Sequence, residues 1–324
     1  MGREADHLRS RPQFSAVATV NRVLVTGAAG FIGRHCLGEL LQRGFEVHAL
    51  SSRPVTKGGG AVVWHRANLL EPSQTAALID RVRPSHLLHL AWYTVPGEYW
   101  TSLENLRWVE GSLRLFLEFA RQGGRRVVAA GSCSEYEWRA GTYGEATTPL
   151  APMSLYGTAK HAVQLLLAAL ARGAGLSAAW GRIFYVFGPH EHPERLVPQV
   201  VTSLLRREPA RCSHGAQRRD FLYVKDVASA LVTLLASPVT GPVNIGSGKA
   251  LPLAELIGKI AEVLDGSRLV ELGAVAGGAG EPELVVADVR RLHEEVGWQP
   301  GFSLEQGIEE TAEWWREQLS GAGS

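Results

Sequence analysis

Apolar runs and amphipathic segments alternate along the first half of the chain. Apolar runs predict buried strands at 23–27, 46–50, 61–65, 86–91, 125–132 and 177–184. Segments of helical periodicity predict helices at 33–43, 73–82, 101–122 and 154–172. Strands that alternate with helices of this length favour a parallel sheet with helices on both faces and right-handed crossovers. The pattern therefore predicts an α/β fold with a doubly wound parallel sheet.

This regularity is lost after Gly188. Loops are expected at 188–195, 212–220 and 274–283. A strand and turn are expected at 241–248, and a last helix at 303–319 with Ser303 as its N-cap. We therefore expect the large sheet to be followed by a smaller, mixed α/β lobe that shares some elements with it.

Composition limits the class of protein. Of the 324 residues 45% are hydrophobic, enough for a sizeable core, and the formal charge of +1 gives no reason to expect nucleic acid or a membrane as partner. No apolar run reaches the roughly 18 residues of a membrane span. Residues 1–22 are charged, lack the apolar core of a signal peptide and predict a flexible tail. Three cysteines without metal-ligand spacing favour a reducing, cytoplasmic setting.

Three closely spaced glycines follow the first predicted strand and precede a predicted helix. Gly27 allows a tight turn, Gly30 allows the backbone to approach a pyrophosphate, and Gly33 allows the helix to lie close to its strand. The unpaired N–H groups at the start of such a helix favour phosphate. The pattern indicates a dinucleotide site, although a glycine-rich turn that binds nothing has the same spacing.

A tyrosine, a lysine and a serine form the second candidate group. Tyr156 and Lys160 are four residues apart on a predicted helix, so their side chains share one face. A neighbouring ammonium is expected to lower the pKa of the tyrosine from about 10 and make it a better proton shuttle. Ser132 ends a predicted strand, where ligands of parallel sheets bind. Taken alone, the pair also fits an ordinary exposed helix face, and the serine fits a turn or cap.

Several motifs occur in an order that resembles one protein family. They are "TGAAGFIG" (26–33), "ANLLE" (67–71), "LLHLA" (87–91), "SLYGTAK" (154–160), "RIFYVFGP" (182–189), "RRDFLYVKDVASA" (218–230), "NIGSG" (244–248) and "VGWQPGFSLEQGI" (296–308). From Val23 onward the chain is similar to the extended short-chain dehydrogenase/reductase family, in its sugar-nucleotide epimerase, dehydratase and reductase branch. Within that branch it most resembles reductases of NDP-4-keto-6-deoxyhexoses.

The resemblance implies a Rossmann-like fold and a set of site residues. It implies an NAD(P)-binding domain from 23–181 and 220–248, and a nucleotide-sugar-binding lobe from 182–219 and 249–324. The implied catalytic residues are Ser132, Tyr156 and Lys160. The implied cofactor-binding residues are Gly27, Ala29, Gly30, Phe31, Ile32, Gly33, Ser51, Ser52, Arg53, Asn68, Leu69, Leu90, Ala91, Tyr156 and Lys160. The expected substrate-binding residues are Trp92, Ser132, Cys133, Ser134, Tyr185 and Arg219. Trp92 is included because it follows a strand end in a cluster with Tyr93, Tyr99 and Trp100 that would wall a sugar site, although core or loop aromatics give the same pattern.

Departures from the family pattern narrow the expected reaction. Dehydratases of the family carry Asp and Glu where this chain has Cys133 and Ser134, and neither residue can do carboxylate acid/base work. Double epimerisation is also disfavoured, because the family places its cysteine one residue later. Arg219 is the expected partner of the substrate diphosphate, since a guanidinium binds phosphate oxygens in a fork. We expect no metal at "PHEHP" (189–193), which fits a solvated loop better.

The end of the second predicted strand bears on the cofactor. A carboxylate there binds the ribose hydroxyls of NAD and repels a 2′-phosphate. This chain has Ser51, Ser52 and Arg53 instead, which suit that phosphate. The sequence therefore favours NADP (NADPH), with NAD as the other possibility.

These observations lead to one preferred function and two alternatives. We expect NADPH-dependent reduction of a nucleotide-linked keto-sugar, a 4-keto-6-deoxyhexose, to its hydroxy sugar. The alternatives are an NAD-dependent nucleotide-sugar epimerase and a non-catalytic NAD(P)-binding regulator. Retention of Ser132, Tyr156 and Lys160 argues against the regulator. The family resemblance also implies a homodimer that packs the helices around 101–122 and 154–172.

Overall fold

The computed structural model describes residues 21–55, 60–277, 280 and 282–321. The tail expected at 1–22 lies outside these residues, except for Asn21 and for Arg22, which begins the first strand.

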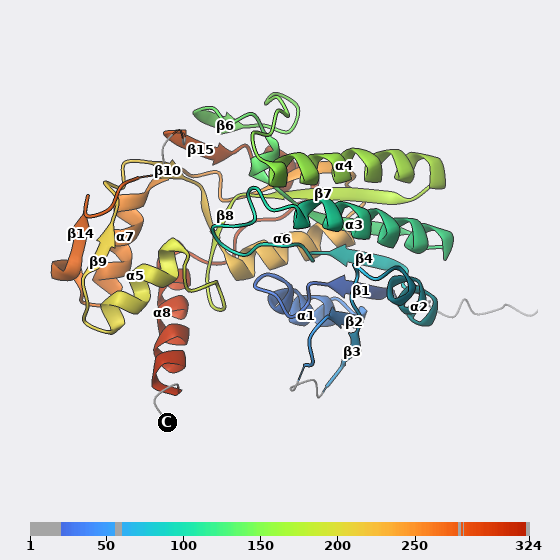
Figure 1. Ribbon diagram of the computed structural model, residues 1–324, viewed down its shortest axis with the longest axis horizontal. Helices are drawn as coiled ribbons and strands as arrows, with labels where there is room; N and C mark the ends of the chain where they lie inside the picture. The colour runs from blue at the N-terminus through green and yellow to red at the C-terminus, as the bar shows by residue number, and fades with distance from the viewer. Residues whose placement is uncertain (1–20, 56–59, 278–279, 281, 322–324) are drawn as a thin grey trace, which may run out of the picture.

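A seven-stranded sheet forms the centre of the molecule (Figure 1). Its strands are β1 (Arg22–Thr26), β2 (Glu46–Ser51), β3 (Val62–Arg66), β4 (His86–His89), β5 (Arg126–Ser132), β7 (Ser177–Ile183) and β12 (Gly241–Ile245). Their order is β12-β7-β5-β4-β1-β2-β3, and every neighbouring pair is parallel. The chain moves outward from β1 to β3 and then crosses to β4 on the other side of β1. The predicted doubly wound, Rossmann-like sheet is thereby confirmed, and ligands of such sheets bind where the strand order reverses.

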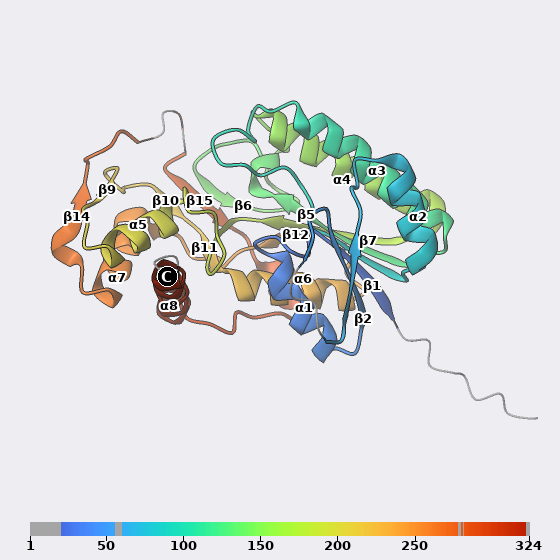
Figure 2. The same ribbon diagram turned by 60° about the horizontal axis from the view of Figure 1, so that its bottom comes forward.

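Helices cover both faces of this sheet (Figure 2). One face carries α1 (Gly33–Gln42) and α6 (Val224–Ala236), and the other carries α2 (Pro72–Val82), α3 (Glu104–Arg121) and α4 (Leu155–Ala174). Each layer encloses its own apolar cluster, because successive strand residues point to opposite faces. Val23 and Val25 of β1 face α1 and α6, whereas Leu24 faces the α2–α4 layer.

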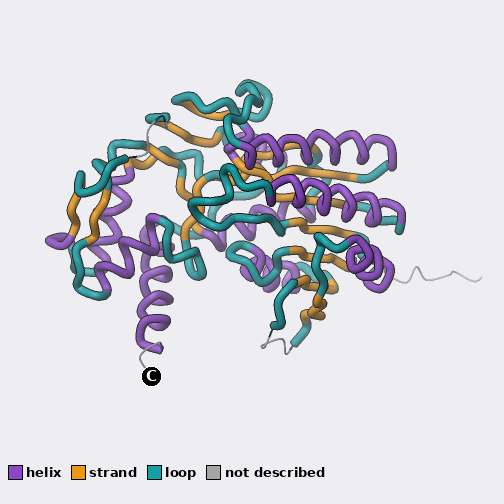
Figure 3. Tube along the Cα trace, in the orientation of Figure 1, coloured by secondary structure: helices purple, strands orange, loops and turns teal. Residues whose placement is uncertain are grey.

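The second lobe lies beside one end of the sheet (Figure 3). Its helices are α5 (Leu196–Leu205), α7 (Leu253–Val263) and α8 (Leu304–Gly321), with the short 3-10 turn η2 (Ser267–Leu269). The π-helical turn η3 (Arg291–Glu295) lies between β15 and α8 in the sequence and packs against β12 of the large sheet. Its small sheets have the orders β13-β10-β15-β6, β11-β8 and β14-β9. The strands are β6 (Gly141–Tyr143), β8 (Tyr185–Phe187), β9 (Ala210–Cys212), β10 (Arg218–Arg219), β11 (Phe221–Tyr223), β13 (Leu251–Pro252), β14 (Val270–Leu272) and β15 (Leu284–Ala287).

The structure adds elements that the hydrophobic pattern did not predict. Helices α5, α6 and α7 lie in the half of the chain where mainly loops were expected. Helix α6 is apolar around most of its circumference and buried, so it lacks the polar face that marks a surface helix. The predicted N-cap of the last helix is confirmed, since Ser303 Oγ accepts the Gln306 N–H at 3.1 Å.

Strand β12 closes the outer edge of the large sheet although it comes late in the sequence. It pairs with β7 along its whole length, from Gly241 to Ile245. The segment that leads into it is held to β5 by the buried guanidinium of Arg126. This group donates to the carbonyl oxygens of Leu234 at 2.6 Å and Val239 at 2.7 Å. The large sheet is therefore built from two separate stretches of chain.

Candidate active site

The glycine-rich turn lies between β1 and α1, at the carboxyl edge of the large sheet. Gly27 has a φ of 66°, and a Cβ there would lie 2.8 Å from the backbone nitrogen of Ala91. A Cβ on Gly33 would lie 2.2 Å from the Gly27 carbonyl oxygen. That same oxygen accepts the Gly30 N–H at 2.9 Å. The first glycine thus permits both the turn and contact with the end of β4, and the third permits close approach of the helix.

The start of α1 fits a bound anion. Among the described residues no side chain caps this helix N-terminus, and its first turn contains no acid. The unpaired N–H groups and the helix dipole therefore favour a negatively charged group at this end. Ala29 and Gly30 are exposed, while Phe31 and Ile32 are partly buried. The turn thus suits the pyrophosphate of a dinucleotide, which this helix end and the glycine backbone would hold.

A buried series of polar contacts, which the sequence did not predict, supports the glycine-rich turn. Thr26 Oγ1 accepts the N–H groups of Leu90 and Ala91 at 3.1 and 3.2 Å, and lies 2.8 Å from His89 Nδ1. His89 Nε2 lies 2.9 Å from Ser112 Oγ on α3. Burial lowers the pKa of His89 to about 3, so the ring stays neutral and links the three elements. In the sequence, the feature that could have indicated these contacts is a histidine within an apolar strand.

The residues expected near the adenosine lie at the ends of β2 and β3. Ser51 Oγ accepts the Arg53 N–H at 3.1 Å and donates to the Arg53 carbonyl at 2.8 Å, and Ser52 and Arg53 are exposed. Asn68 folds back onto its own loop, where its Oδ1 accepts the Leu70 N–H at 3.1 Å. Leu69 is buried. The end of β2 therefore presents hydroxyl and guanidinium groups to the solvent.

Ser132, Tyr156 and Lys160 come together at the carboxyl end of β5. Ser132 is the last residue of β5, and the other two lie on the first turns of α4. The Ser132 hydroxyl is close enough to Tyr156 to lower the pKa of its phenol, against the opposing effect of burial. Lys160 Nζ is buried and donates to the Ala130 carbonyl at 2.9 Å, while it lies 4.0 Å from the centre of the Trp92 ring. A serine, a tyrosine and a lysine thus lie at the same carboxyl edge of the sheet as the glycine-rich turn.

The expected effect of Lys160 on Tyr156 is not seen. Burial and the neighbouring Tyr99 raise the pKa of Tyr156 above its ordinary value, and the nearby Ser132 side chain lowers it by less. The reason is geometric, since Lys160 directs its amine at the Ala130 carbonyl and at Trp92. Burial also lowers the pKa of Lys160 to about 7, with the charge of Glu135 acting in the opposite direction. The phenol is therefore held protonated, as a proton donor requires.

The expected substrate residues fall into two groups. Trp92 is near the site, because its ring contacts Lys160 and its indole donates to Asn105 Oδ1 at 2.9 Å. Ser134 is also near, since Ser132 Oγ donates to its hydroxyl at 3.1 Å. The other three residues of the set are buried or belong to the second lobe. Cys133 is in a buried apolar cluster, Tyr185 is on β8, and Arg219 donates to the Pro282 carbonyl at 2.8 Å from a buried position on β10.

An aromatic wall, defined as Tyr99, Trp100 and Trp138, lines the outer side of Tyr156. The Tyr156 ring meets Tyr99 and Trp100 edge-on, with centroids 4.9 and 5.8 Å apart. Trp138 meets Trp100 edge-on at 5.9 Å. The Arg195 guanidinium, which precedes α5 of the second lobe, lies 5.2 Å from the centre of the Tyr99 ring. The second lobe therefore contacts the aromatic wall. An apolar surface with one nearby cation thus borders the phenol.

Within the described ranges no group of three or more His, Cys, Asp or Glu side chains is arranged to hold a metal ion. Nor is any helix among these residues long and apolar enough to cross a membrane. A Rossmann-like sheet, an anion-binding turn and a Ser–Tyr–Lys group instead define a dinucleotide-dependent, oxidoreductase-type enzyme.

Comparison with known proteins gives the family. The pattern of the NAD dependent epimerase/dehydratase family matches residues 23–246. MoeE5, solved in complex with UDP-glucose and NAD, is 33% identical, with a TM-score of 0.81 over 92% of this chain and 99% of that one. The UDP-glucose 4-epimerase of Thermotoga maritima, solved with UDP-glucose, is 25% identical, with a TM-score of 0.82 over the same shares. UDP-glucuronic acid decarboxylase 1 of Arabidopsis thaliana is 27% identical over 89% of this chain and 68% of its own. The chain belongs to the NAD dependent epimerase/dehydratase family.

Proposed function

We propose that this enzyme reduces a nucleotide-linked keto-sugar to the hydroxy sugar with NADPH. The observation that carries the proposal is the group of Ser132, Tyr156 and Lys160 at the same carboxyl edge of the sheet as the glycine-rich turn. The turn and the start of α1 would hold the dinucleotide, whose nicotinamide supplies hydride when bound. A carbonyl carbon that accepts hydride needs a proton donor at its oxygen, and this site offers a protonated phenol.

Three side chains have different roles in the proposed proton transfer. Ser132 and Tyr156 hold the carbonyl oxygen by two hydrogen bonds, and Tyr156 gives up its proton as charge develops there. Lys160 is buried on the next turn of α4, and although its amine is directed at Ala130 and Trp92, its charged form would add positive charge to the site during the reaction. Positive charge favours the phenolate that remains after proton transfer.

Two features support a nucleotide sugar that already carries its ketone. MoeE5 and the Thermotoga enzyme were both solved with UDP-glucose, so a nucleotide-diphosphate sugar is the substrate class that the fold accepts in relatives. Cys133 and Ser134 stand where dehydration would need carboxylates, and burial raises the pKa of Cys133 to about 12, which removes it from proton transfer. The aromatic wall suits the apolar edge of a 6-deoxy sugar, so we propose a 4-keto-6-deoxyhexose.

The preference for NADPH rests on the end of β2. Ser51, Ser52 and Arg53 present hydroxyls and a guanidinium where a carboxylate would repel a 2′-phosphate. MoeE5 and the UDP-glucose 4-epimerase of Thermus thermophilus were both solved with NAD. NAD is therefore the alternative cofactor, and direct competition between the two decides between them.

A second candidate is an NAD-dependent nucleotide-sugar epimerase. It is favoured by the structures themselves, since the Thermotoga enzyme and the enzyme of Thermus thermophilus are UDP-glucose 4-epimerases. The Ser–Tyr–Lys group can run hydride transfer in both directions, so these residues serve either reaction. The two reactions differ in cofactor use, because an epimerase regenerates its cofactor in place and a reductase consumes it.

We test the proposal by incubating the purified protein with a panel of nucleotide-diphosphate keto-sugars and either NADPH or NADH. We expect stoichiometric loss of reduced-nicotinamide absorbance with NADPH, and a product with a single configuration at the new hydroxyl. Interconversion of two hydroxy sugars without net loss of reduced cofactor would establish the epimerase instead.

We also propose a homodimer formed through α3 and α4. Large apolar side chains are exposed along and beside these two neighbouring helices, namely Leu103, Leu106, Leu117, Met153, Leu165 and Leu166. Exposed apolar surface along two helices that pack together is typical of a protein interface. A second copy placing the same helices against these would bury it symmetrically.

A further inference from the structure

A fully enclosed ion pair lies between the end of β5 and strand β7. Arg182 Nε is 2.8 Å from Glu135 Oε2, and neither side chain is exposed. Removing two charges from water is costly, and such a pair often stabilises a fold no better than apolar residues of the same volume would. The contacts of the carboxylate suggest another reason for its presence.

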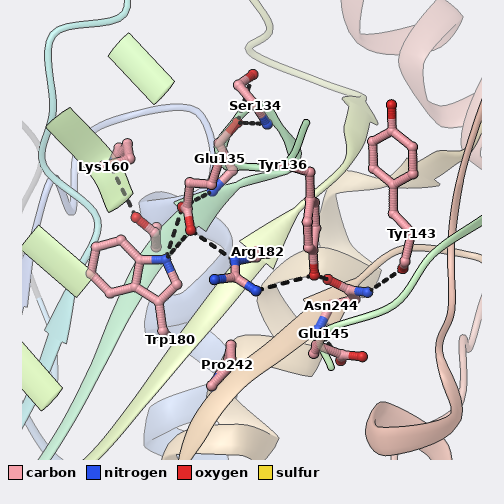
Figure 4. A network of polar contacts seen from close by, with 12 residues as sticks. Ser134, Glu135, Tyr136, Tyr143, Glu145, Lys160, Trp180, Arg182, Pro242 and Asn244 are labelled. Carbon is pink, nitrogen blue, oxygen red and sulfur yellow. Dashed lines mark hydrogen bonds and ion pairs between the residues drawn. The ribbon is translucent and has the colours of Figure 1, made fainter. Parts of the chain in front are cut away.

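The carboxylate of Glu135 binds the backbone of Ser132. Figure 4 shows the same carboxylate directed at the side chains of Trp180 and Arg182. Glu135 Oε1 accepts the Ser132 N–H at 2.8 Å and the Trp180 indole N–H at 2.8 Å. Ser132 Oγ in turn accepts the Ser134 N–H at 3.2 Å, so the two side chains cap the short turn η1 (Cys133–Glu135) reciprocally. A Cβ on Gly131 would lie 2.6 Å from Glu135 Oε1, so only a glycine leaves room for this contact.

The opposite side of the ion pair is anchored in the second lobe. Arg182 Nη1 donates to the Tyr136 hydroxyl at 3.2 Å, and that hydroxyl donates to Asn244 Oδ1 at 2.7 Å. Asn244 Nδ2 then donates to the carbonyls of Tyr143 at 2.7 Å and Asp288 at 3.1 Å. The network therefore runs from the catalytic serine across β7 and β12 to the small sheet, and Glu135 cannot move without disturbing it.

The negative charge of Glu135 also acts on Lys160. Lys160 Nζ donates to Ala130, two residues before Ser132, and burial disfavours its charged form. Glu135 favours that charged form. The charged and titratable groups that interact with Glu135 or Lys160 are Arg182 of β7, Tyr136 and Cys133 of the turn, Tyr156 of α4 and His89 of β4.

We propose that Glu135 is a positioning residue of the Ser–Tyr–Lys site, held by Arg182 and Trp180, that fixes the backbone of Ser132 and places a negative charge in the surroundings of Lys160. The proposal rests on the proposed reaction for its kinetic consequence. It makes the buried pair part of the catalytic apparatus without placing Glu135 in contact with substrate.

The test compares the wild-type enzyme with a variant that removes both buried charges. Glu135→Gln alone would leave Arg182 buried without a counter-charge and can fail to fold, so the main variant is Glu135→Gln/Arg182→Met. The chain has five lysines, so ε-carbon-labelled lysine gives few NMR signals, and Lys160→Met identifies the one of interest. We expect Lys160 in the double variant to titrate at least about half a pH unit lower than in the wild type.

Kinetics on the proposed substrate provide the second readout. With less Lys160 charged, the alkaline limb of the kcat profile should move to lower pH by the same amount as the lysine titration. At neutral pH kcat should fall at least about tenfold, with a smaller change in KM, because positioning of Ser132 matters most in the transition state.

The matched control is Tyr136→Phe. This change removes the hydroxyl between Arg182 and Asn244 but keeps Glu135 and its bonds to Ser132 and Trp180. We expect Lys160 to titrate there as in the wild type. Identical lysine titrations in the wild type and the double variant would overturn the role of Glu135. If the wild type reduces no keto-sugar, the proposed reaction is wrong, but the lysine titration needs no substrate and still decides on Glu135.

Discussion

Tyr156 carries the hydroxyl on which the proposed chemistry depends. Its ring is fixed edge-on against Tyr99 and Trp100, and the Ser132 hydroxyl lowers the pKa of its phenol against the effect of burial. Tyr156→Phe keeps these ring contacts and removes only the proton donor. We expect kcat to fall by about 10²–10⁴-fold, the usual contribution of general acid catalysis, with the melting temperature and NADPH binding nearly unchanged. Turnover close to that of the wild type would remove Tyr156 from the mechanism.

Arg53 is the residue expected to distinguish the two cofactors. It is exposed at the end of β2, beside the Ser51 hydroxyl that bonds its backbone. Arg53→Ala removes one charge-assisted contact to a 2′-phosphate. The variant should therefore bind NADPH more weakly by about 1.5–3 kcal/mol, and its affinity for NADH should hardly change. Fluorescence titration of both cofactors measures this difference. Tighter binding of NADH than NADPH by the unmodified protein would contradict the assignment.

Glu191 is a buried carboxyl group outside the proposed mechanism. Its Oε2 has no hydrogen-bond partner among the described residues, and burial raises its pKa from 4.5 to about 8. Between these values the unfolded chain has lost the proton and the folded protein keeps it, so stability falls as pH rises through this window.

Glu191→Gln should therefore remove that loss of stability. We expect the variant to be more stable than the wild type by roughly 1–3 kcal/mol above pH 8 and to lose this advantage towards pH 4.5. Melting temperatures across this pH range provide the measurement. Glu194→Gln, an exposed position on the same loop, is the control. An advantage that does not depend on pH would show that the cause is packing and not ionisation.

At the scale of elements, helix α1 contains two glycines with opposite surroundings. Gly33 lies against the Gly27 carbonyl, whereas a Cβ on Gly38 would meet nothing within 4 Å. We expect Gly33→Ala to cost about 1–3 kcal/mol of stability and to weaken dinucleotide binding, because α1 must move away from the turn. Gly38→Ala should instead stabilise the protein by about 0.5–1 kcal/mol. Equal effects of the two changes on denaturant midpoints would contradict the close packing of the turn.

The sequence predicted those elements whose hydrophobic pattern is regular. Strands β1 to β5 and helices α1 to α4 are within a few residues of their predicted positions. Their pattern is regular because each of these helices has one exposed and one buried face and the strands between them are short apolar runs. Helices α5 to α7 were missed because their apolar faces meet other elements on several sides, which blurs the helical period. Ser132 and Tyr156 were found by motif. Glu135, His89 and Asn105 were not, because the sequence does not show which distant partner satisfies a buried polar group.

At the scale of the whole molecule, the proposed dimer can be tested with two leucines of equal exposure. Leu166 on α4 and Leu272 on β14 are both 49% exposed. Leu166→Glu should place an unpaired charge in the proposed interface and shift the protein towards monomer, whereas Leu272→Glu should not. Light scattering after size-exclusion chromatography gives the molar mass. A wild-type protein that is already monomeric would rule out the interface.

Strand β12 has a consequence for how the molecule is made. A ribosome synthesises the chain from β1 onward, but the outer edge of β7 stays without its partner until residues 241–245 have emerged. By then most of α5, β9 and α6 has already been synthesised. Until that moment β7 is an open strand edge able to pair with another chain. We expect nascent chains that stop before Gly241 to aggregate, and those that extend past Ile245 to become protease-resistant.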